Sequence, residues 1–122
     1  MAHILIIDDE RAIVDLLETM LAQDGHVVFK AANGEEGVRL AADTAFELVI
    51  ADILMPRKGG LEAIAELRTV QPNIKVILIS GAGVGANDAV VADLAGEFGA
   101  DAFLPKPLRV QTVRETVRAC LD

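Results

Sequence analysis

Short apolar runs alternate with helical stretches along this whole chain, and this alternation limits the fold more than any other feature. The runs expected to form strands cover residues 4–7, 27–29, 46–51, 74–79 and 102–104. After each run, apolar residues recur every three or four positions, as on one face of a helix, in stretches near residues 11–23, 34–42, 61–71, 88–98 and 110–121. Alternating strands and helices predict a parallel sheet covered on both faces. We therefore expect an α/β fold, a doubly wound five-stranded parallel sheet with five helices.

Composition narrows the class of protein further. The 122 residues match one domain, expected to span 1–122, and 52% hydrophobic content indicates a globular chain. No apolar run is long enough to cross a membrane and no signal segment opens the chain, which predicts a cytoplasmic location. The net charge of -8 argues against direct nucleic-acid binding, and the single Cys120 agrees with a reducing compartment.

Polar side chains follow four of the five expected strands. Asp8 and Asp9 follow the first, Asp52 the third, Ser80 the fourth and Lys106 the fifth. In a doubly wound sheet of order 2-1-3-4-5, the first and third strands are neighbours at the point where the strand order reverses. That order would gather three carboxylates at one edge of the sheet, with a hydroxyl and an ammonium beside them.

Three clustered carboxylates repel one another unless a cation compensates them. Oxygen ligands alone suit Mg²⁺, and a carboxylate beside Mg²⁺, a lysine and a hydroxyl suits phosphoryl acceptance. Taken singly, each residue has an ordinary explanation: acidic residues favour helix N-termini, and Asp52 could cap a turn. Their coincidence at four strand ends favours a functional site.

At these residues the chain strongly resembles the receiver domain of two-component response regulators. The resemblance rests on motifs at residues 6–10, 51–56 with 60–62, 79–81 and 99–107, and it covers essentially the whole chain. It implies the flavodoxin-like fold of the chemotaxis regulators. It also implies a cytoplasmic phosphorelay protein rather than an enzyme, apart from self-catalysed phosphotransfer and autodephosphorylation.

The resemblance implies a role for each site residue. Asp52 matches the phosphoacceptor, which takes its phosphoryl group from a sensor histidine kinase or a phosphotransfer protein. Asp8 and Asp9 match the pair that binds Mg²⁺, Asp9 directly and Asp8 largely through water, together with the Asp52 side chain and the Leu54 backbone carbonyl. Lys106 matches the lysine that contacts the phosphoryl group.

The resemblance also implies a switch. Ser80 matches the hydroxyl residue that moves toward the phosphoryl group, and Phe103 the aromatic residue that turns inward with it. These changes would alter the surface of the fourth helix, fifth strand and fifth helix for an unknown downstream effector, in a monomer or a phosphorylation-dependent dimer. The Lys106–Pro107 bond is a candidate for the cis form.

The chain departs from the family pattern after Ser80. The interval to Lys106 is longer than usual and the excess is rich in glycine, which predicts a mobile loop and a displaced or late fourth helix. Leu54 and Ala82 are apolar where some relatives carry polar residues that position water, which predicts slower loss of the phosphoryl group.

Two other classes of function are weighed against the receiver. A phosphatase of the haloacid dehalogenase type also uses an Asp nucleophile and Mg²⁺, but it requires Asp-x-Asp after its first strand, where this chain has Asp8-Asp9 and no cap insertion. A pseudo-receiver would bind partners without phosphorylation, and the presence of all five site residues argues against it.

Overall fold

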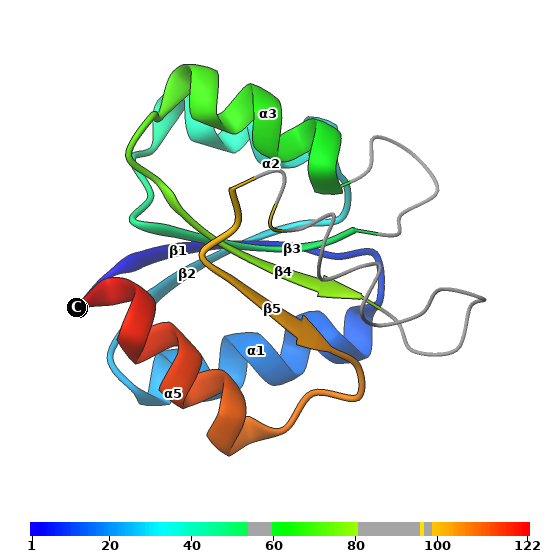
Figure 1. Cartoon of the computed structure of the whole chain (residues 1–122), viewed down its shortest axis with the longest axis vertical. Coiled ribbons are helices and arrows are strands. Elements are labelled where there is room, and N and C mark those ends of the chain that lie inside the picture. Colours follow the sequence, from blue (N-terminus) through cyan, green and yellow to red (C-terminus); the bar gives the residue numbers. More distant parts are fainter. Residues whose placement is uncertain (54–59, 81–95, 97–98) are drawn as a thin grey trace.

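The computed structural model of the chain describes residues 1–53, 60–80, 96 and 99–122. Five strands form one parallel sheet in the order β2-β1-β3-β4-β5 (Figure 1). The strands are β1 (His3–Ile7), β2 (Val27–Ala31), β3 (Leu48–Asp52), β4 (Lys75–Ser80) and β5 (Ala102–Pro105). The predicted strand order and the predicted parallel sheet are confirmed.

Helices cover both faces of this sheet. Four helices fall in the described residues, α1 (Arg11–Gln23), α2 (Gly34–Asp43), α3 (Gly60–Val70) and α5 (Val110–Leu121). Figure 1 shows α1 and α5 on one face and α2 and α3 on the other. The helix expected before Gly99 and the glycine-rich loop after Ser80 lie outside the described residues, as do Leu54 and Ala82.

The alternation of side chains along each strand divides the core into two layers. Ile4 and Ile6 of β1 pack with buried residues of α1 and α5, whereas Leu5 and Ile7 pack with buried residues of α2 and α3. All four side chains are fully buried, and each such burial stabilises the fold by roughly 1.5–3 kcal/mol. A strand buried on both faces must be apolar throughout, which explains the continuous apolar runs.

Local signals set where the elements begin and end. The side chain of Asn33 accepts a hydrogen bond from the Glu36 backbone N–H at 2.9 Å and so caps the N-terminus of α2. Gly25 follows α1 with φ of 88°, a left-handed conformation that glycine adopts without strain.

One side chain that the sequence did not single out holds the entry to β3. The Gln71 amide donates to the carbonyls of Ala41 and Thr44 at 2.9 and 2.7 Å, and its Oε1 accepts from the Phe46 N–H at 2.8 Å. These bonds tie the end of α2 and the start of β3 to the residue after α3. They therefore help to place the strand that carries Asp52.

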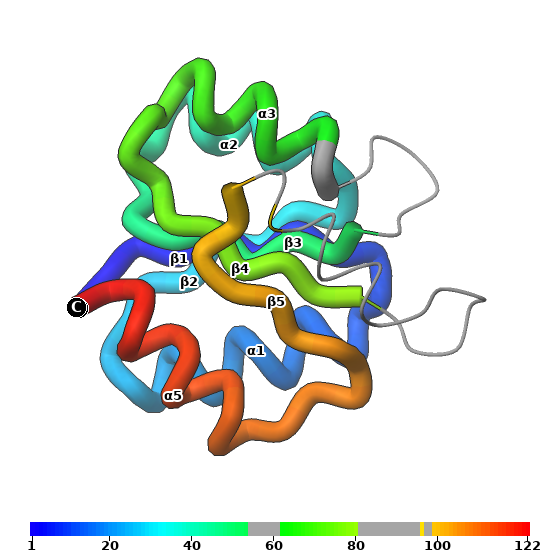
Figure 2. The backbone as a smooth tube through the Cα atoms, in the orientation of Figure 1, coloured from blue at the N-terminus to red at the C-terminus, as the bar shows by residue number. Residues whose placement is uncertain are grey.

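The register of the strands brings the polar strand ends to one edge. Ile7 pairs with Ala51, so the residues that follow them, Asp8 and Asp52, lie side by side. The C-terminal end of α5 lies by the opposite edge, where β1 begins (Figure 2).

Within the described ranges, no helix has the length and apolar character needed to cross a bilayer.

The close packing of Gly37 in α2 against Ile7 yields a test of how the β1 end is held. A Cβ built at Gly37 would lie 2.5 Å from Ile7 Cδ1 and 2.9 Å from Ile7 Cγ1. Overpacking costs about 1–3 kcal/mol, and the better helix propensity of alanine returns about 1 kcal/mol. We expect Gly37→Ala to lower the free energy of unfolding by about 1 kcal/mol, measured by urea denaturation. Arg39→Ala, at an exposed position of the same helix, serves as the control, and a stabilised Gly37→Ala would contradict this packing.

Candidate functional site

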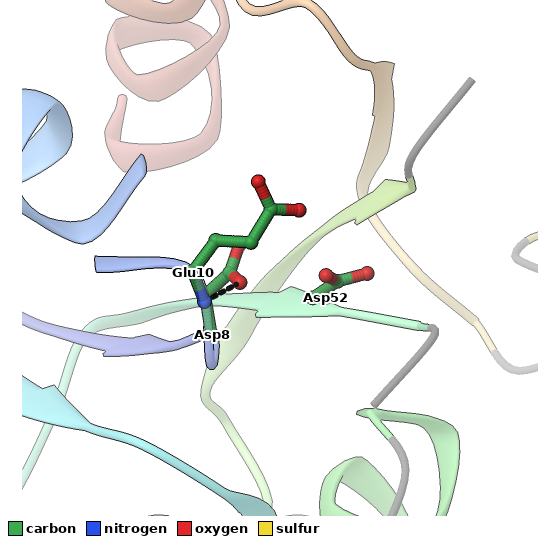
Figure 3. A group of neighbouring side chains, drawn as sticks. All are labelled: Asp8, Glu10 and Asp52. Carbon is green, nitrogen blue, oxygen red and sulfur yellow. Dashed lines mark hydrogen bonds between the residues drawn. The ribbon is translucent and has the colours of Figure 1, made fainter. Parts of the chain in front are cut away.

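Two buried carboxylates lie at the centre of the site. Asp8 follows β1, Asp52 ends β3, and each residue is 2% exposed. Asp8 Oδ1 accepts a hydrogen bond from the Glu10 backbone N–H at 2.8 Å (Figure 3). One carboxylate oxygen from each of Asp8, Glu10 and Asp52 lies within 4.8 Å of the others. The β1–α1 connection and the end of β3 therefore bring three carboxylates together.

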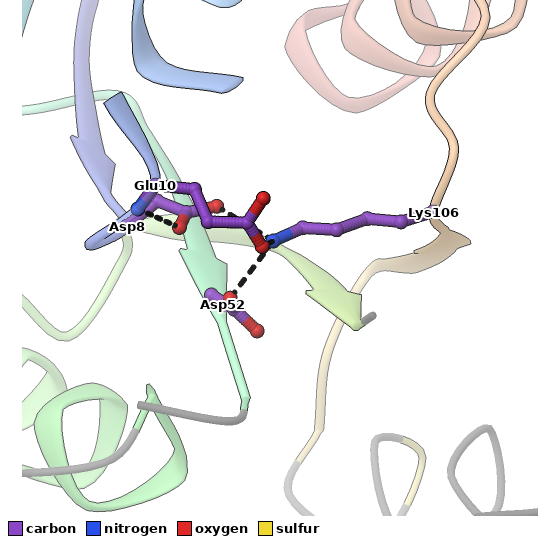
Figure 4. Close-up of polar contacts among 4 residues, drawn as sticks. All are labelled: Asp8, Glu10, Asp52 and Lys106. Atoms are coloured by element: carbon purple, nitrogen blue, oxygen red, sulfur yellow. Dashed lines mark hydrogen bonds and ion pairs between the residues drawn. The ribbon is translucent and has the colours of Figure 1, made fainter. Parts of the chain in front are cut away.

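Lys106 enters this group from the end of β5 (Figure 4). Its Nζ lies 2.7 Å from Glu10 Oε1, 3.0 Å from Asp52 Oδ2 and 3.2 Å from Asp8 Oδ2. The backbone holds it there, because the Lys106 N–H donates to the Ser80 carbonyl at 2.8 Å. The Lys106 side chain is 8% exposed, so it is a buried cation among acidic groups.

Burial and the neighbouring carboxylates shift the pKa of Lys106 in opposite directions. Burial alone lowers the pKa of an ammonium group, but the hydrogen bonds to Glu10 and Asp52 and the charges of Asp52 and Asp8 outweigh it. The pKa of Lys106 is therefore raised above its usual range, and the residue is charged at neutral pH.

The pKa of Asp8 is also raised, but for a different reason. Burial, and to a lesser degree the charge of Asp52, raise the pKa of the Asp8 carboxyl, although the Glu10 N–H and Lys106 partly oppose this. Its buried Oδ2 makes no hydrogen bond within the part of the chain that the structure describes. This carboxylate is ionised at a cost, and a second cation would reduce that cost.

The donor set fits Mg²⁺. All of the grouped donors are oxygens, and Mg²⁺ takes one or two carboxylates directly while keeping several waters. The unsatisfied Oδ2 of Asp8 is aimed into the group and offers a ready ligand or water acceptor. Asp8, Glu10 and Asp52 are the residues that would hold such an ion.

The other predicted site residues lie around this group. Ser80 is buried at the end of β4, beside the strand that leads to Lys106. Phe103 is half-buried on β5 and packs on the layer that includes α2 and α3. Asp9 is exposed and is not among the three grouped carboxylates, and Leu54 lies outside the described residues. The Lys106–Pro107 bond is cis, as predicted.

Glu10 is the site residue that sequence reasoning missed. It closes the Asp8-Asp9-Glu10 run, where an acidic residue before a helix indicates only favourable charge at the helix N-terminus. It is the N-cap residue of α1, yet its side chain makes no capping bond and reaches Lys106 instead. Only the fold reveals this contact, since the two residues are 96 positions apart in the chain.

The fold and the site together define a class of protein. A buried carboxylate at the switch point of a 2-1-3-4-5 sheet, with further acidic groups and a lysine beside it, is an arrangement suited to reversible phosphoryl transfer to aspartate. This is the chemistry of phosphorelay signalling.

Comparison with known proteins gives the family. Residues 4–118 match the response regulator receiver domain, and the chain belongs to this family. It is therefore a receiver in two-component phosphorelay signalling. Receiver domains act as phosphoacceptors, and the phosphatase and pseudo-receiver alternatives are not favoured.

Individual relatives agree with this assignment. The chain is 34% identical to the DNA-binding transcriptional regulator NtrC of Azospirillum brasilense, over 99% of this chain and 24% of that protein. It is 34% identical to the response regulator MprA of Mycobacterium sp. (strain KMS), over 98% of this chain and 50% of that protein. A crystal structure of a response regulator receiver domain protein from Clostridium thermocellum superposes with a TM-score of 0.87 at 31% identity, covering 99% of this chain and 94% of the other.

The chain spans only part of each of these two curated relatives. It covers about a quarter of the length of NtrC and half of the length of MprA.

The raised pKa of Asp8 yields a test of the cation site. The folded protein binds the Asp8 proton more tightly than the unfolded chain does, so this group's contribution to stability falls as pH rises through 3.8 toward the folded pKa. Without divalent cations at pH 7, we expect Asp8→Asn to raise the free energy of unfolding by about 1 kcal/mol, because the amide keeps the acceptor for the Glu10 N–H and removes the buried charge.

Added Mg²⁺ should reverse this order. The ion stabilises the folded wild type by mass action and should stabilise Asp8→Asn much less. Urea denaturation with and without Mg²⁺ measures both effects, and Asp15→Asn at an exposed position of α1 is the control. Equal stabilisation of both proteins by Mg²⁺ would exclude Asp8 from the cation site.

Proposed function

We propose that Asp52 is the phosphoacceptor of this receiver and that its phosphodonor is the phosphohistidine of a sensor kinase or phosphotransfer protein. The observation that carries the proposal is the position of the Asp52 carboxylate, buried at the switch point with the Lys106 ammonium 3.0 Å from Oδ2. A buried, charge-compensated carboxylate is a fixed nucleophile whose attack needs little further organisation.

The transfer exchanges one bond to phosphorus for another. An oxygen of Asp52 forms the new O–P bond while the P–N bond to the donor imidazole breaks, and the imidazole keeps the electron pair of that bond. Positioning and charge neutralisation supply most of the catalysis in such transfers. Lys106, already charged, donates an N–H to Asp52 Oδ2 at 3.0 Å and would donate to the transferred group from the same position.

The acidic residues supply the cation site in this proposal. Mg²⁺, when bound, would neutralise negative charge on the phosphoryl oxygens and offset the repulsion among the carboxylates. Asp8 and Asp52 are the buried ligands or water acceptors, and the resemblance adds Asp9 and the Leu54 carbonyl. Ser80, buried at the end of β4, would donate its hydroxyl to a phosphoryl oxygen.

The consequence of phosphorylation is a shift between two states of one surface. The added group brings about -1.5 to -2 charge, and Ser80 and Phe103 are the residues proposed to respond to it. Phe103 is half-buried in the described state, so it has room to become more buried. The surface involves β5, α5 and the helix expected before them, and a downstream effector would recognise the shifted state.

Partners and output are part of the proposal. We infer a sensor histidine kinase or phosphotransfer protein upstream, an effector domain or protein downstream, and a monomer or a dimer that forms on phosphorylation. The acidic net charge of -8 speaks against direct nucleic-acid binding by this domain. A cytoplasmic location and one domain over 1–122 stay predictions.

Intact mass measurement tests the acceptor. Wild type, Asp52→Asn and the control Asp43→Asn, at an exposed position of α2, are incubated with Mg²⁺ and a small-molecule phosphodonor. We expect one phosphoryl adduct on wild type and on Asp43→Asn and none on Asp52→Asn, because an amide cannot replace the carboxylate nucleophile. An adduct of equal yield on Asp52→Asn would place the acceptor elsewhere, and no adduct on wild type with any donor would revive the pseudo-receiver.

A further inference from the structure

The nearest partner of Lys106 is Glu10, which is one of the three carboxylates that could hold a cation but takes no part in the bond exchange at phosphorus. Glu10 Oε1 lies 2.7 Å from Nζ, closer than the oxygens of Asp52 and Asp8 at 3.0 and 3.2 Å. Two of the three N–H donors of the ammonium group bind Glu10 and Asp52, and Asp8 Oδ2 lies beside it as an ion-pair partner. A newly arrived anion therefore meets an ammonium that already has three carboxylates around it.

The three carboxylates differ in what they lose when the ammonium leaves. The side chain of Glu10 is 57% exposed, whereas those of Asp8 and Asp52 are 0% and 3% exposed. An exposed carboxylate regains water when its partner moves away, but a buried one is left without compensation. Glu10 is therefore the partner that Lys106 can give up at least cost.

The backbone of Glu10 is held so that its side chain meets Lys106. Its N–H donates to Asp8 Oδ1 at 2.8 Å, and its carbonyl accepts from the N–H groups of Ile13 and Val14, each at 3.1 Å. These bonds fix the residue on both sides at the start of α1. The side chain is not used in capping the helix and points toward the ammonium.

We propose that Glu10 is a positioning residue that holds Lys106 in the unphosphorylated state and releases it to the phosphoryl group. The inference rests on the proposed role of Asp52 as acceptor. A phosphoryl oxygen on Asp52 adds a fourth anionic neighbour to Lys106, and the contact with Glu10 is exchanged for it. The contact stabilises the unphosphorylated state only, so it lowers the phosphorylated fraction at a given supply of donor.

Three variants separate the contact from the charge. Glu10→Gln removes the charge, and Glu10→Asp keeps the charge but shortens the side chain by one methylene, so that it no longer reaches Nζ. Glu35→Gln removes the same charge at an exposed position in the first turn of α2 and is the matched control.

The first measurement needs no phosphorylation. Nitrogen-15 NMR follows the proton exchange of the Lys106 ammonium in the cation-free protein. We expect Glu10→Gln and Glu10→Asp to speed this exchange by about threefold or more and Glu35→Gln to leave it unchanged, since the loss of an exposed ion pair is a modest effect. Unchanged exchange in Glu10→Gln would overturn the proposal.

The second measurement uses saturating Mg²⁺ and a small-molecule phosphodonor. Intact mass gives the steady-state ratio of phosphorylated to unphosphorylated protein, which we expect to rise about two- to fivefold in Glu10→Gln and Glu10→Asp. An unchanged ratio in both variants while wild type is phosphorylated would overturn the role of Glu10 alone. A ratio that falls in Glu10→Gln but stays at the wild-type value in Glu10→Asp would also overturn it, because the charge would then serve the cation. No adduct on wild type would instead overturn the acceptor role of Asp52, and with it the release step.

Discussion

The buried ammonium of Lys106 is the interaction on which the site depends. Asp8 and Asp52 are almost completely buried, and two buried carboxylates would be unstable in their charged form without a compensating cation. In this structure Lys106 supplies that charge and contacts both of them as well as Glu10. Lys106 compensates the buried carboxylates only in part, because the pKa of Asp8 stays raised and its buried Oδ2 makes no hydrogen bond in the described region. The site thus retains a capacity to accept further positive charge.

The sheet topology creates this concentration of charge. β1 and β3 are neighbours at the switch point, where the strand order reverses. A crevice forms outside the carboxyl ends of the two strands there, which is why ligands bind at this point in open α/β sheets. Residues at positions 8, 10, 52 and 106 then come from three separate parts of the chain. The two core layers, one around α1 and α5 and the other around α2 and α3, hold these strand ends in register. A site of this kind combines a rigid base with groups at the rim that can exchange partners.

Membership in the receiver family explains the function of this site, and the comparison applies only to the part of each relative that the chain matches. The chain corresponds to a receiver domain, and the two curated relatives described here are two to four times longer than the part it matches. A receiver converts a change of charge at one carboxylate into a change of surface. In the function proposed above, the chemistry resides in the strand ends, and the effector would recognise the surface that includes β5 and α5.

Much of the fold followed from the sequence alone. Periodicity located all five strands within a few residues and the four described helices, because burial on two faces demands apolar runs and burial on one face demands a helical stripe. The strand-end positions of Asp8, Asp52, Ser80 and Lys106 were also predictable, since polar residues interrupt those runs abruptly. The Gln71 bonds to Ala41, Thr44 and Phe46 were not, because an ordinary polar residue after a helix carries no signal of its distant partners.

What only the tertiary structure decided is how the charges at the site are paired. The sequence determined that three acidic residues, a hydroxyl and one lysine would share an edge of the sheet, because parallel strands end on the same side. The resemblance named Asp8 and Asp9 as the pair that binds Mg²⁺, and the structure adds Glu10, which contacts Lys106, while Asp9 is exposed. Neighbouring residues at the start of a helix point in different directions, and which of them meets a group 96 residues away depends on the packing of whole elements. The proposal of Asp52 as acceptor followed from the coincidence of polar residues at four strand ends, whereas the contact between Glu10 and Lys106 could be found only in the folded structure.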